Sequence, residues 1–175
     1  MDFSKFRTAD WIMVAAGLVM LIFAMVLDWA TIDTEFGSGS GNGPFDYFFT
    51  GGIAWILVVG VGVVALLLAT GTIKPNGVQW PILLVLASAV ATLLMLIRVI
   101  LGAGDEAGFE FDRGSGMYVA LIAAIASLVG AVMAYRASGG DLNDFKDVNK
   151  LKGAFSRSAS PGASTPPPPP PPPAV

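Results

Sequence analysis

The chain has 175 residues, of which 54% are hydrophobic and only 13% are charged. A soluble domain carries about 25% charged residues, so this composition excludes an ordinary soluble globule and indicates a membrane protein. The absence of Cys and His excludes disulfides, thiolate chemistry and histidine-based acid–base catalysis. The net charge is only −3, and its distribution among the loops is more informative than its total.

Residues 1–10 form a short basic segment, which we expect on the cytoplasmic side. Residues 11–28 form an apolar run without a recognisable signal-peptide cleavage site, so we predict an uncleaved first membrane span. Trp11 and Trp29 bracket this run. Because tryptophan is enriched at membrane–water interfaces, we expect both side chains at the headgroup level.

The connection over residues 28–50 is acidic and contains neither Lys nor Arg. Its GSGSGNGP stretch is rich in small, turn-forming residues and predicts a flexible segment. The aromatic PFDYFF stretch at 44–49 lies directly before the second span. We interpret it as an interfacial anchor for that span; the alternative is an exposed docking surface for a partner or a lipid.

Two further apolar runs, residues 51–73 and 80–103, are predicted as the second and third spans. A helix rises about 1.5 Å per residue, so roughly 20 apolar residues cross a hydrocarbon core about 30 Å thick. The KPNG sequence at 74–77 is typical of a tight turn. With so short a connection, we expect the second and third helices to be antiparallel neighbours.

Arg98 is the one charged residue within the third span. A charge inside a membrane is costly, and such residues are usually paired or functional. Three interpretations are open. The side chain reaches the nearby headgroups, it forms an intramembrane ion pair with Asp28 at the end of the first span, or it lines a substrate or ion path.

A second acidic loop, residues 104–116, precedes the fourth predicted span at residues 117–137. Small residues recur in this span in two series at steps of four, and each series lies on one face of a helix. Small side chains let helix backbones approach closely in a membrane, so we expect these residues to pack inside the bundle. The candidate packing residues are Ala123, Ser127, Ala131, Ala126, Gly130 and Ala134.

Two segments follow the fourth span. Residues 138–157 have an amphipathic helical pattern and are predicted to be cytoplasmic; this segment either lies on an anionic membrane surface or forms a solvated or bundle-capping helix. Residues 158–175 are predicted to be a disordered tail. Its eight consecutive prolines favour a polyproline II rod, which is either a semi-rigid spacer or a ligand for an aromatic groove of a cytoplasmic protein. The candidate docking residues are Pro166, Pro167, Pro168, Pro169, Pro170, Pro171, Pro172 and Pro173.

Basic residues are distributed unevenly among the connections. The N-terminal segment, the 74–77 turn and the segment after the fourth span carry Lys or Arg, whereas the two intervening loops hold one basic residue against eight acidic ones. Cytoplasmic loops are enriched in Lys and Arg. We therefore predict a multi-pass protein of the plasma membrane with both termini in the cytoplasm and both acidic loops outside.

The predicted fold class is all-α: an antiparallel bundle of four transmembrane helices with a disordered Pro-rich C-terminal tail. The sequence contains no nucleophile elbow, phosphate-binding loop, zinc-protease motif or dinucleotide-binding fingerprint. The acidic residues of the second loop lack the spacing of an EF-hand. We therefore expect no enzymatic activity, no metal ion and no cofactor.

The layout of the chain combines a short basic start, a first span that closes in Leu27-Asp28-Trp29, two small outer loops and a Pro-rich tail. In this layout the chain resembles small uncharacterised four-helix membrane proteins of actinobacteria. The resemblance covers the whole chain and implies a multi-pass membrane protein. It implies no activity and no site residues.

Two functions are open. The first is a non-enzymatic scaffold or accessory subunit of a membrane complex, with a cytoplasmic tail that binds a partner. Its expected partners are the lipid bilayer, a membrane protein or further copies of the chain, and a cytoplasmic protein at the tail, but no nucleic acid. The alternative is a small oligomeric transporter or channel component, which needs a polar path. For such a path the spans offer Ser88, Thr92, Arg98 and Ser127.

Overall fold

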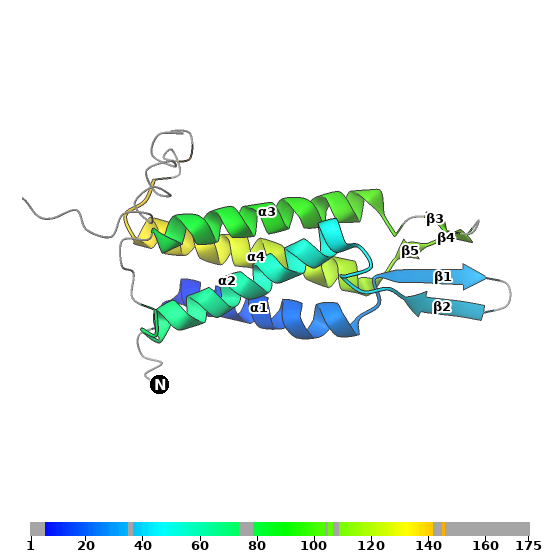
Figure 1. Cartoon of the computed structure of the whole chain (residues 1–175), viewed down its shortest axis with the longest axis horizontal. Coiled ribbons are helices and arrows are strands. Elements are labelled where there is room, and N and C mark those ends of the chain that lie inside the picture. Colours follow the sequence, from blue (N-terminus) through cyan, green and yellow to red (C-terminus); the bar gives the residue numbers. More distant parts are fainter. Residues whose placement is uncertain are drawn as a thin grey trace, which may run out of the picture.

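The computed structural model describes residues 6–34, 37–73, 79–103, 105–106, 109–141 and 145. It contains four long helices, α1 (Thr8–Val26), α2 (Ile53–Ala69), α3 (Trp80–Leu101) and α4 (Ser115–Ala137), and a π-helical turn, η2 (Phe48–Gly52), leads into α2. Successive helices run antiparallel and lie side by side (Figure 1). We call the end with the start of α1 and the end of α4 the terminal end, and the opposite end, where the strands lie, the strand end.

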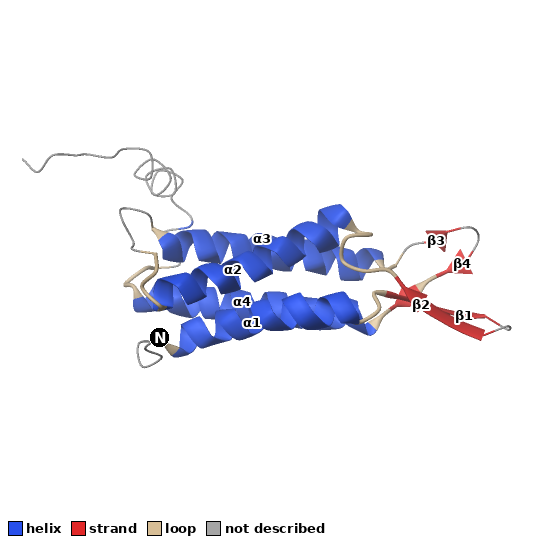
Figure 2. Ribbon diagram, turned by 60° about the horizontal axis from the view of Figure 1, so that its bottom comes forward, coloured by secondary structure: helices blue, strands red, loops and turns tan. Residues whose placement is uncertain are grey.

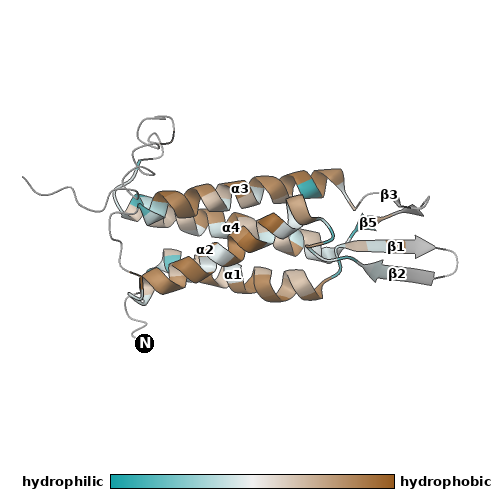
Figure 3. Cartoon of the chain, viewed as in Figure 1, coloured by the Kyte–Doolittle hydropathy of each residue, from teal (hydrophilic) through white to brown (hydrophobic). Residues whose placement is uncertain are grey.

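All four helices are long and apolar enough to cross a membrane, with the η2 turn counted as part of the second. Figure 3 shows hydrophobic residues along most of their length. The prediction of four long apolar helices is therefore confirmed. Local sequence signals set their boundaries, as α3 shows. Pro81 occupies its first turn, where the missing N–H needs no partner, and Gly102 ends the helix with a φ of 76°.

The bundle is held together by contacts between neighbouring helices: α1 packs on α2 and α4, and α3 packs on the same two helices. Its interior is built from small and flexible side chains. The largest fully buried helix side chains are those of Met13, Met20, Met95 and Met117, set among alanines and glycines. Val58, Val61, Leu84 and Val85 are also buried, but many other bulky Leu, Ile, Val and Phe side chains of the helices are exposed.

The backbones of α1 and α2 come into contact at Gly17 and Gly62. A Cβ atom added to either glycine would lie 3.0 Å from the Cα atom of the other, and a Cβ on Gly62 would also lie 3.1 Å from the carbonyl oxygen of Met13. Gly60, two positions away on α2, faces open space. Small residues thus set the helix spacing here, as is common in membranes.

The strand end carries two small sheets that were not predicted from the sequence (Figure 2). β1 (Ala30–Thr34) and β2 (Gly37–Gly41) form an antiparallel hairpin, and β5 (Asp112–Arg113) pairs with the other edge of β1. The second sheet consists of β3 (Asp105–Glu106) and β4 (Phe109–Glu110). The pairing of β1 with β5 joins two loops that lie far apart in the sequence.

The prediction of a flexible segment is wrong for residues 37–41, which form β2. Glycine and serine have little preference of their own for strands, but β1 offers this segment a row of hydrogen-bonding partners. Ile32 lies opposite Gly39, and a Cβ on Gly39 would lie 3.1 Å from Cγ2 of Ile32. The missing side chain therefore lets Ile32 pack across the hairpin. The fold is therefore mainly helical and not purely α. We call the two small sheets, β2-β1-β5 and β3-β4, the β platform.

Candidate functional site

Trp29 is completely buried at the strand end, just after α1. Its indole Nε1–H donates to the carbonyl oxygen of Ala24 (2.7 Å), its backbone N–H donates to that of Asn42 (3.2 Å), and its own carbonyl accepts from the backbone N–H of Gly114 (3.0 Å). The residue therefore ties α1 to the loop after β2 and to the start of α4.

Two glycines make room for the Trp29 ring. A Cβ on Gly51 of η2 would lie 2.9 Å from Cζ3 of the ring, and a Cβ on Gly116 of α4 would lie 2.6 Å from Cδ1. The Trp29 side chain is therefore enclosed by η2 and α4 and faces neither lipid nor water, and its N–H is satisfied inside the protein. Trp11, in the first turn of α1, is 49% exposed.

Tyr47, in the loop before η2, is held in place from several sides. Its ring stacks on that of Trp29, with centroids 6.4 Å apart and an interplanar angle of 26°. Its hydroxyl group donates to the carbonyl oxygen of Ala103 (3.0 Å) and accepts from Nδ2 of Asn42 (3.0 Å). Sequence reasoning recognised only the aromatic character of this stretch and missed the role of Tyr47.

Arg98 continues the buried face of α3 and lies against Tyr47. The residue is only 8% exposed, and its guanidinium carbon Cζ lies 3.3 Å from the centroid of the Tyr47 ring, in a cation–π contact. Its Nε and Nη2 atoms are buried and have no hydrogen-bond partner. In the described part of the chain Arg98 and Asp28 form no ion pair. The structure brings Arg98 to Tyr47 instead.

Arg113 of β5 offers a contrast at the same end of α3. Its Nε donates to the carbonyl oxygen of Val99 (2.7 Å) and its Nη2 to that of Ile100 (3.3 Å). The last carbonyl groups of a helix have no partner within the helix, and a cation there also suits the negative end of the helix dipole. Arg113 therefore caps α3, whereas two donor atoms of Arg98 have no acceptor.

A buried polar cluster joins α3 to α4 inside the bundle. The hydroxyl oxygens of Ser88 and Ser127 are 3.1 Å apart. Thr92 Oγ1 donates to the carbonyl oxygens of Ser88 (2.8 Å) and Ala124 (3.1 Å). Because each hydroxyl group has a partner within the protein, the cluster connects two helices rather than offering free polar groups along a path.

The residues predicted to pack on α4 face two different helices. Ser127 meets Ser88 of α3, whereas a Cβ on Gly130 would lie 2.8 Å from Cγ of Met13 and 3.1 Å from the carbonyl oxygen of Ala9, both on α1. Ala126 is half-buried. The buried members of the set are Ala123, Ser127, Ala131, Gly130 and Ala134.

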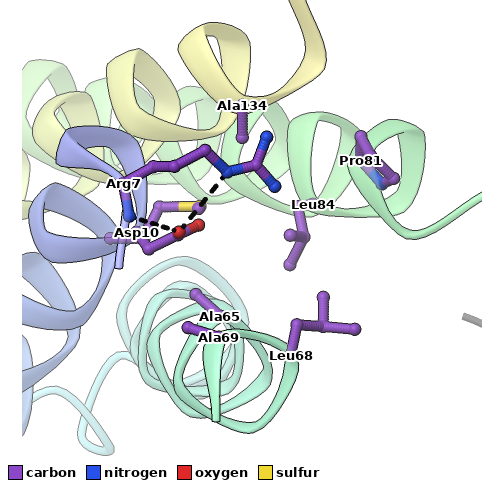
Figure 4. A pocket seen from close by; sticks show the side chains of 9 residues that line it. Arg7, Asp10, Ala65, Leu68, Ala69, Pro81, Leu84 and Ala134 are labelled. Atoms are coloured by element: carbon purple, nitrogen blue, oxygen red, sulfur yellow. Dashed lines mark hydrogen bonds and ion pairs between the residues drawn. The ribbon is translucent and has the colours of Figure 1, made fainter. Parts of the chain in front are cut away.

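A pocket of about 270 Å³ lies between all four helices near the terminal end (Figure 4). Arg7 and Asp10 form its polar wall. The Nε atom of Arg7 lies 3.8 Å from Oδ2 of Asp10, and the same oxygen accepts a hydrogen bond from the backbone N–H of Arg7 (3.0 Å). Leu68, Leu84 and Pro81 contribute to its apolar walls. The carboxylate of Asp10 caps the first turn of α1 and offsets the charge of Arg7. The pocket therefore presents little net charge to a ligand.

Of the segment after α4, the structure describes residues 138–141 and 145. The ring of Phe145 contacts that of Tyr135, with centroids 5.1 Å apart, and the Tyr135 hydroxyl donates to the carbonyl oxygen of Asp141 (3.2 Å). The rest of the predicted amphipathic segment and the candidate docking prolines 166–173 lie outside the described residues.

Among the described residues, no three acidic side chains gather closely enough to hold a metal ion. Comparisons of the chain with protein-family models, with curated proteins and with solved structures found no match. The strongest candidate site is the cluster of Trp29, Tyr47 and Arg98 at the strand end, because it contains a buried cation whose Nε and Nη2 atoms have no acceptor.

Proposed function

We propose that the chain is a multi-pass protein of the plasma membrane that acts as a non-enzymatic scaffold or accessory subunit. The observation that carries this proposal is the reversed distribution of large and small apolar side chains. The helices bury mainly alanine, glycine and methionine, while Phe23, Ile100 and Ile122 are 50%, 73% and 66% exposed. Exposing such a surface to water is unfavourable in free energy, whereas lipid chains are as apolar as leucine side chains.

The interior of the bundle supports a scaffold more than a transporter. Ser88, Thr92 and Ser127, which the transporter alternative needs along a path, bond to one another and to backbone carbonyls. Methionine side chains and the contact between Gly17 and Gly62 fill space between the helices. Satisfied hydroxyl groups and helix backbones in direct contact favour a fixed support for other proteins over a bundle that opens and closes.

The charges at the two ends of the bundle support an orientation with both termini in the cytoplasm. Arg7 precedes α1 and Arg136 lies in the last turn of α4, both at the terminal end. Asp28, Asp46 and Asp112 belong to the connections at the strand end. Because Lys and Arg are enriched on the cytoplasmic side, the proposal places the β platform outside and the Pro-rich tail inside, where it binds a partner.

Partner capture tests the scaffold role. The full chain and a chain shortened after residue 157 are extracted from the same membranes in a mild detergent. The proposal expects a specific cytoplasmic protein that the full chain retains and the shortened chain loses. In parallel, the purified protein is reconstituted into vesicles and assayed for passage of ions and small solutes. Flux above that of empty vesicles, without any tail-dependent partner, would favour the transporter instead.

A further inference from the structure

We propose that the guanidinium group of Arg98 is a binding site for a phosphate-type oxyanion at the strand end of the bundle. Its Nε and Nη2 atoms are buried and lack a hydrogen-bond partner. These two nitrogens share one edge of the planar group and direct N–H bonds in nearly the same direction. Such an edge donates two parallel hydrogen bonds to the oxygens of one carboxylate or phosphate group.

Leaving both donors without a partner is unfavourable, because a buried polar group has given up its hydrogen bonds to water. The polar side chains around Arg98 avoid this cost. Tyr47 bonds to Asn42 and Ala103, and Arg113 bonds to two carbonyl groups of α3. Arg98 differs from these described neighbours, and an oxyanion supplies the pair of acceptors that its free edge requires.

Tyr47 holds this donor pair in position. Its ring covers one face of the guanidinium group, with 3.3 Å between Cζ and the ring centroid. The Tyr47 hydroxyl is itself anchored to Ala103 and Asn42. Tyr47 covers one face of the group, and the edge with Nε and Nη2 is buried, so a ligand reaches this edge by displacing the side chains that cover it. Because the side chain is already held before binding, little side-chain entropy remains to be lost when a ligand arrives.

The position of Arg98 along α3 favours a phosphate group as the ligand. The helix ends at Leu101, three residues further on, which is roughly 5 Å along the axis. In a membrane-spanning bundle this depth is next to the headgroup layer, where phospholipids carry their phosphates. Two sources share this chemistry, a lipid headgroup and a free phosphate ion from the aqueous side. Only the first of them depends on the proposed membrane embedding.

The test compares the wild-type chain with Arg98→Gln, Arg98→Lys and Arg113→Gln after removal of lipid in an uncharged, phosphate-free detergent. The lysine variant keeps the charge but lacks the two-pronged edge. The Arg113 variant removes a nearby cation whose Nε and Nη2 already have acceptors. In one arm inorganic phosphate replaces chloride at constant ionic strength, and in the other phosphatidylglycerol replaces a phosphate-free glycolipid. Melting temperature is recorded in both arms, and native mass spectrometry counts bound phosphate or lipid.

A ligand at tenfold excess over its Kd raises the melting temperature of a chain of this size by about 3–6 °C. We expect this saturable rise in the wild type and in Arg113→Gln, less than half of it in Arg98→Lys, and none in Arg98→Gln. A rise in the phosphate arm alone identifies a free ion, and a rise in the lipid arm alone identifies a headgroup. If Arg98→Gln does not fold, the comparison of Arg98→Lys with Arg113→Gln decides in its place. The proposal is overturned if the wild type responds in neither arm, or if the Arg98 variants respond as strongly as the wild type.

Discussion

The guanidinium carbon of Arg98 lies 3.3 Å from the centre of the Tyr47 ring. A residue of the loop before η2 thereby covers the one charged side chain of α3. The hydroxyl of the same tyrosine bonds to the carbonyl oxygen of Ala103 (3.0 Å), just beyond the end of that helix. Together with Trp29, which stacks on Tyr47, this contact connects α1, α3 and the loop before η2 at the strand end.

Two replacements of Tyr47 separate the parts of this contact. Tyr47→Phe keeps a ring over Arg98 but removes the hydroxyl that donates to Ala103, and we expect it to lower the free energy of unfolding by about 1 kcal/mol. Tyr47→Leu also removes the cation–π attraction and the ring stacking, with a further loss of about 1–2 kcal/mol. Reversible unfolding in mixed micelles measures both changes. Equal stability of Tyr47→Leu and the wild type would show that the contact contributes nothing.

Gly116→Ala tests whether the Trp29 ring is enclosed. The new methyl group would lie 2.6 Å from Cδ1 of Trp29 and 2.7 Å from the carbonyl oxygen of Leu27. We therefore expect the free energy of unfolding to fall by about 1–3 kcal/mol. Gly41→Ala is the matched control, because nothing lies within 4 Å of a Cβ at that position. Chemical denaturation followed by tryptophan fluorescence compares the two variants. If they unfold at the same denaturant concentration, Gly116 does not enclose the ring.

Two glycines of α2 are expected to respond differently to the same replacement. Gly62→Ala places a methyl group 3.0 Å from Cα of Gly17, which pushes α1 and α2 apart and should lower stability by about 1–3 kcal/mol. Gly60→Ala meets nothing within 4 Å and gains helix propensity, so stability should stay equal or rise by up to about 1 kcal/mol. Thermal melting in one detergent measures both variants. Greater damage from Gly60→Ala than from Gly62→Ala would contradict the described crossing.

The hydroxyl pair of Ser88 and Ser127 can be examined with a double-mutant cycle. The two oxygens are 3.1 Å apart between α3 and α4, so the effects of Ser88→Ala and Ser127→Ala should not be additive. We expect a coupling of about 0.6 kcal/mol, the average for hydrogen bonds between membrane helices. Unfolding free energies of the two single variants, the double variant and the wild type provide this number. Strictly additive losses would mean that the hydroxyl groups do not interact.

The four helices were predictable because each is an apolar run with local boundary signals. The third span was predicted at residues 80–103, and α3 runs from Trp80 to Leu101, with Pro81 in its first turn. Ser127 and Gly130 belong to the two different series of small residues on α4. In the structure Ser127 contacts α3 and Gly130 contacts α1. Apolar runs, boundary residues and helical spacing are all local features of the sequence, so they can be read without knowing the fold.

The strand end was not predictable in the same way. β2 consists only of glycine and serine, so its strand conformation depends on pairing with β1 and leaves no local pattern. The pairing of Ala30 with Arg113 joins residues that are separated by the two long helices α2 and α3. Tyr47 differs from the neighbouring phenylalanines only by a hydroxyl group, and its role depends on Arg98 and Ala103, both more than one helix away. A lone tyrosine beside the membrane and a lone arginine within a span were the available signals.

The membrane orientation of the bundle can be measured directly with single thiols, because the natural chain contains no cysteine. Ser40→Cys on β2 and Ser138→Cys after α4 introduce thiols at two exposed positions on opposite ends of the bundle. Intact cells are treated with a membrane-impermeant maleimide, before and after permeabilisation. We predict that Ser40→Cys is labelled in intact cells and that Ser138→Cys is labelled only after permeabilisation. Labelling of Ser138→Cys in intact cells, with Ser40→Cys protected, would contradict this orientation.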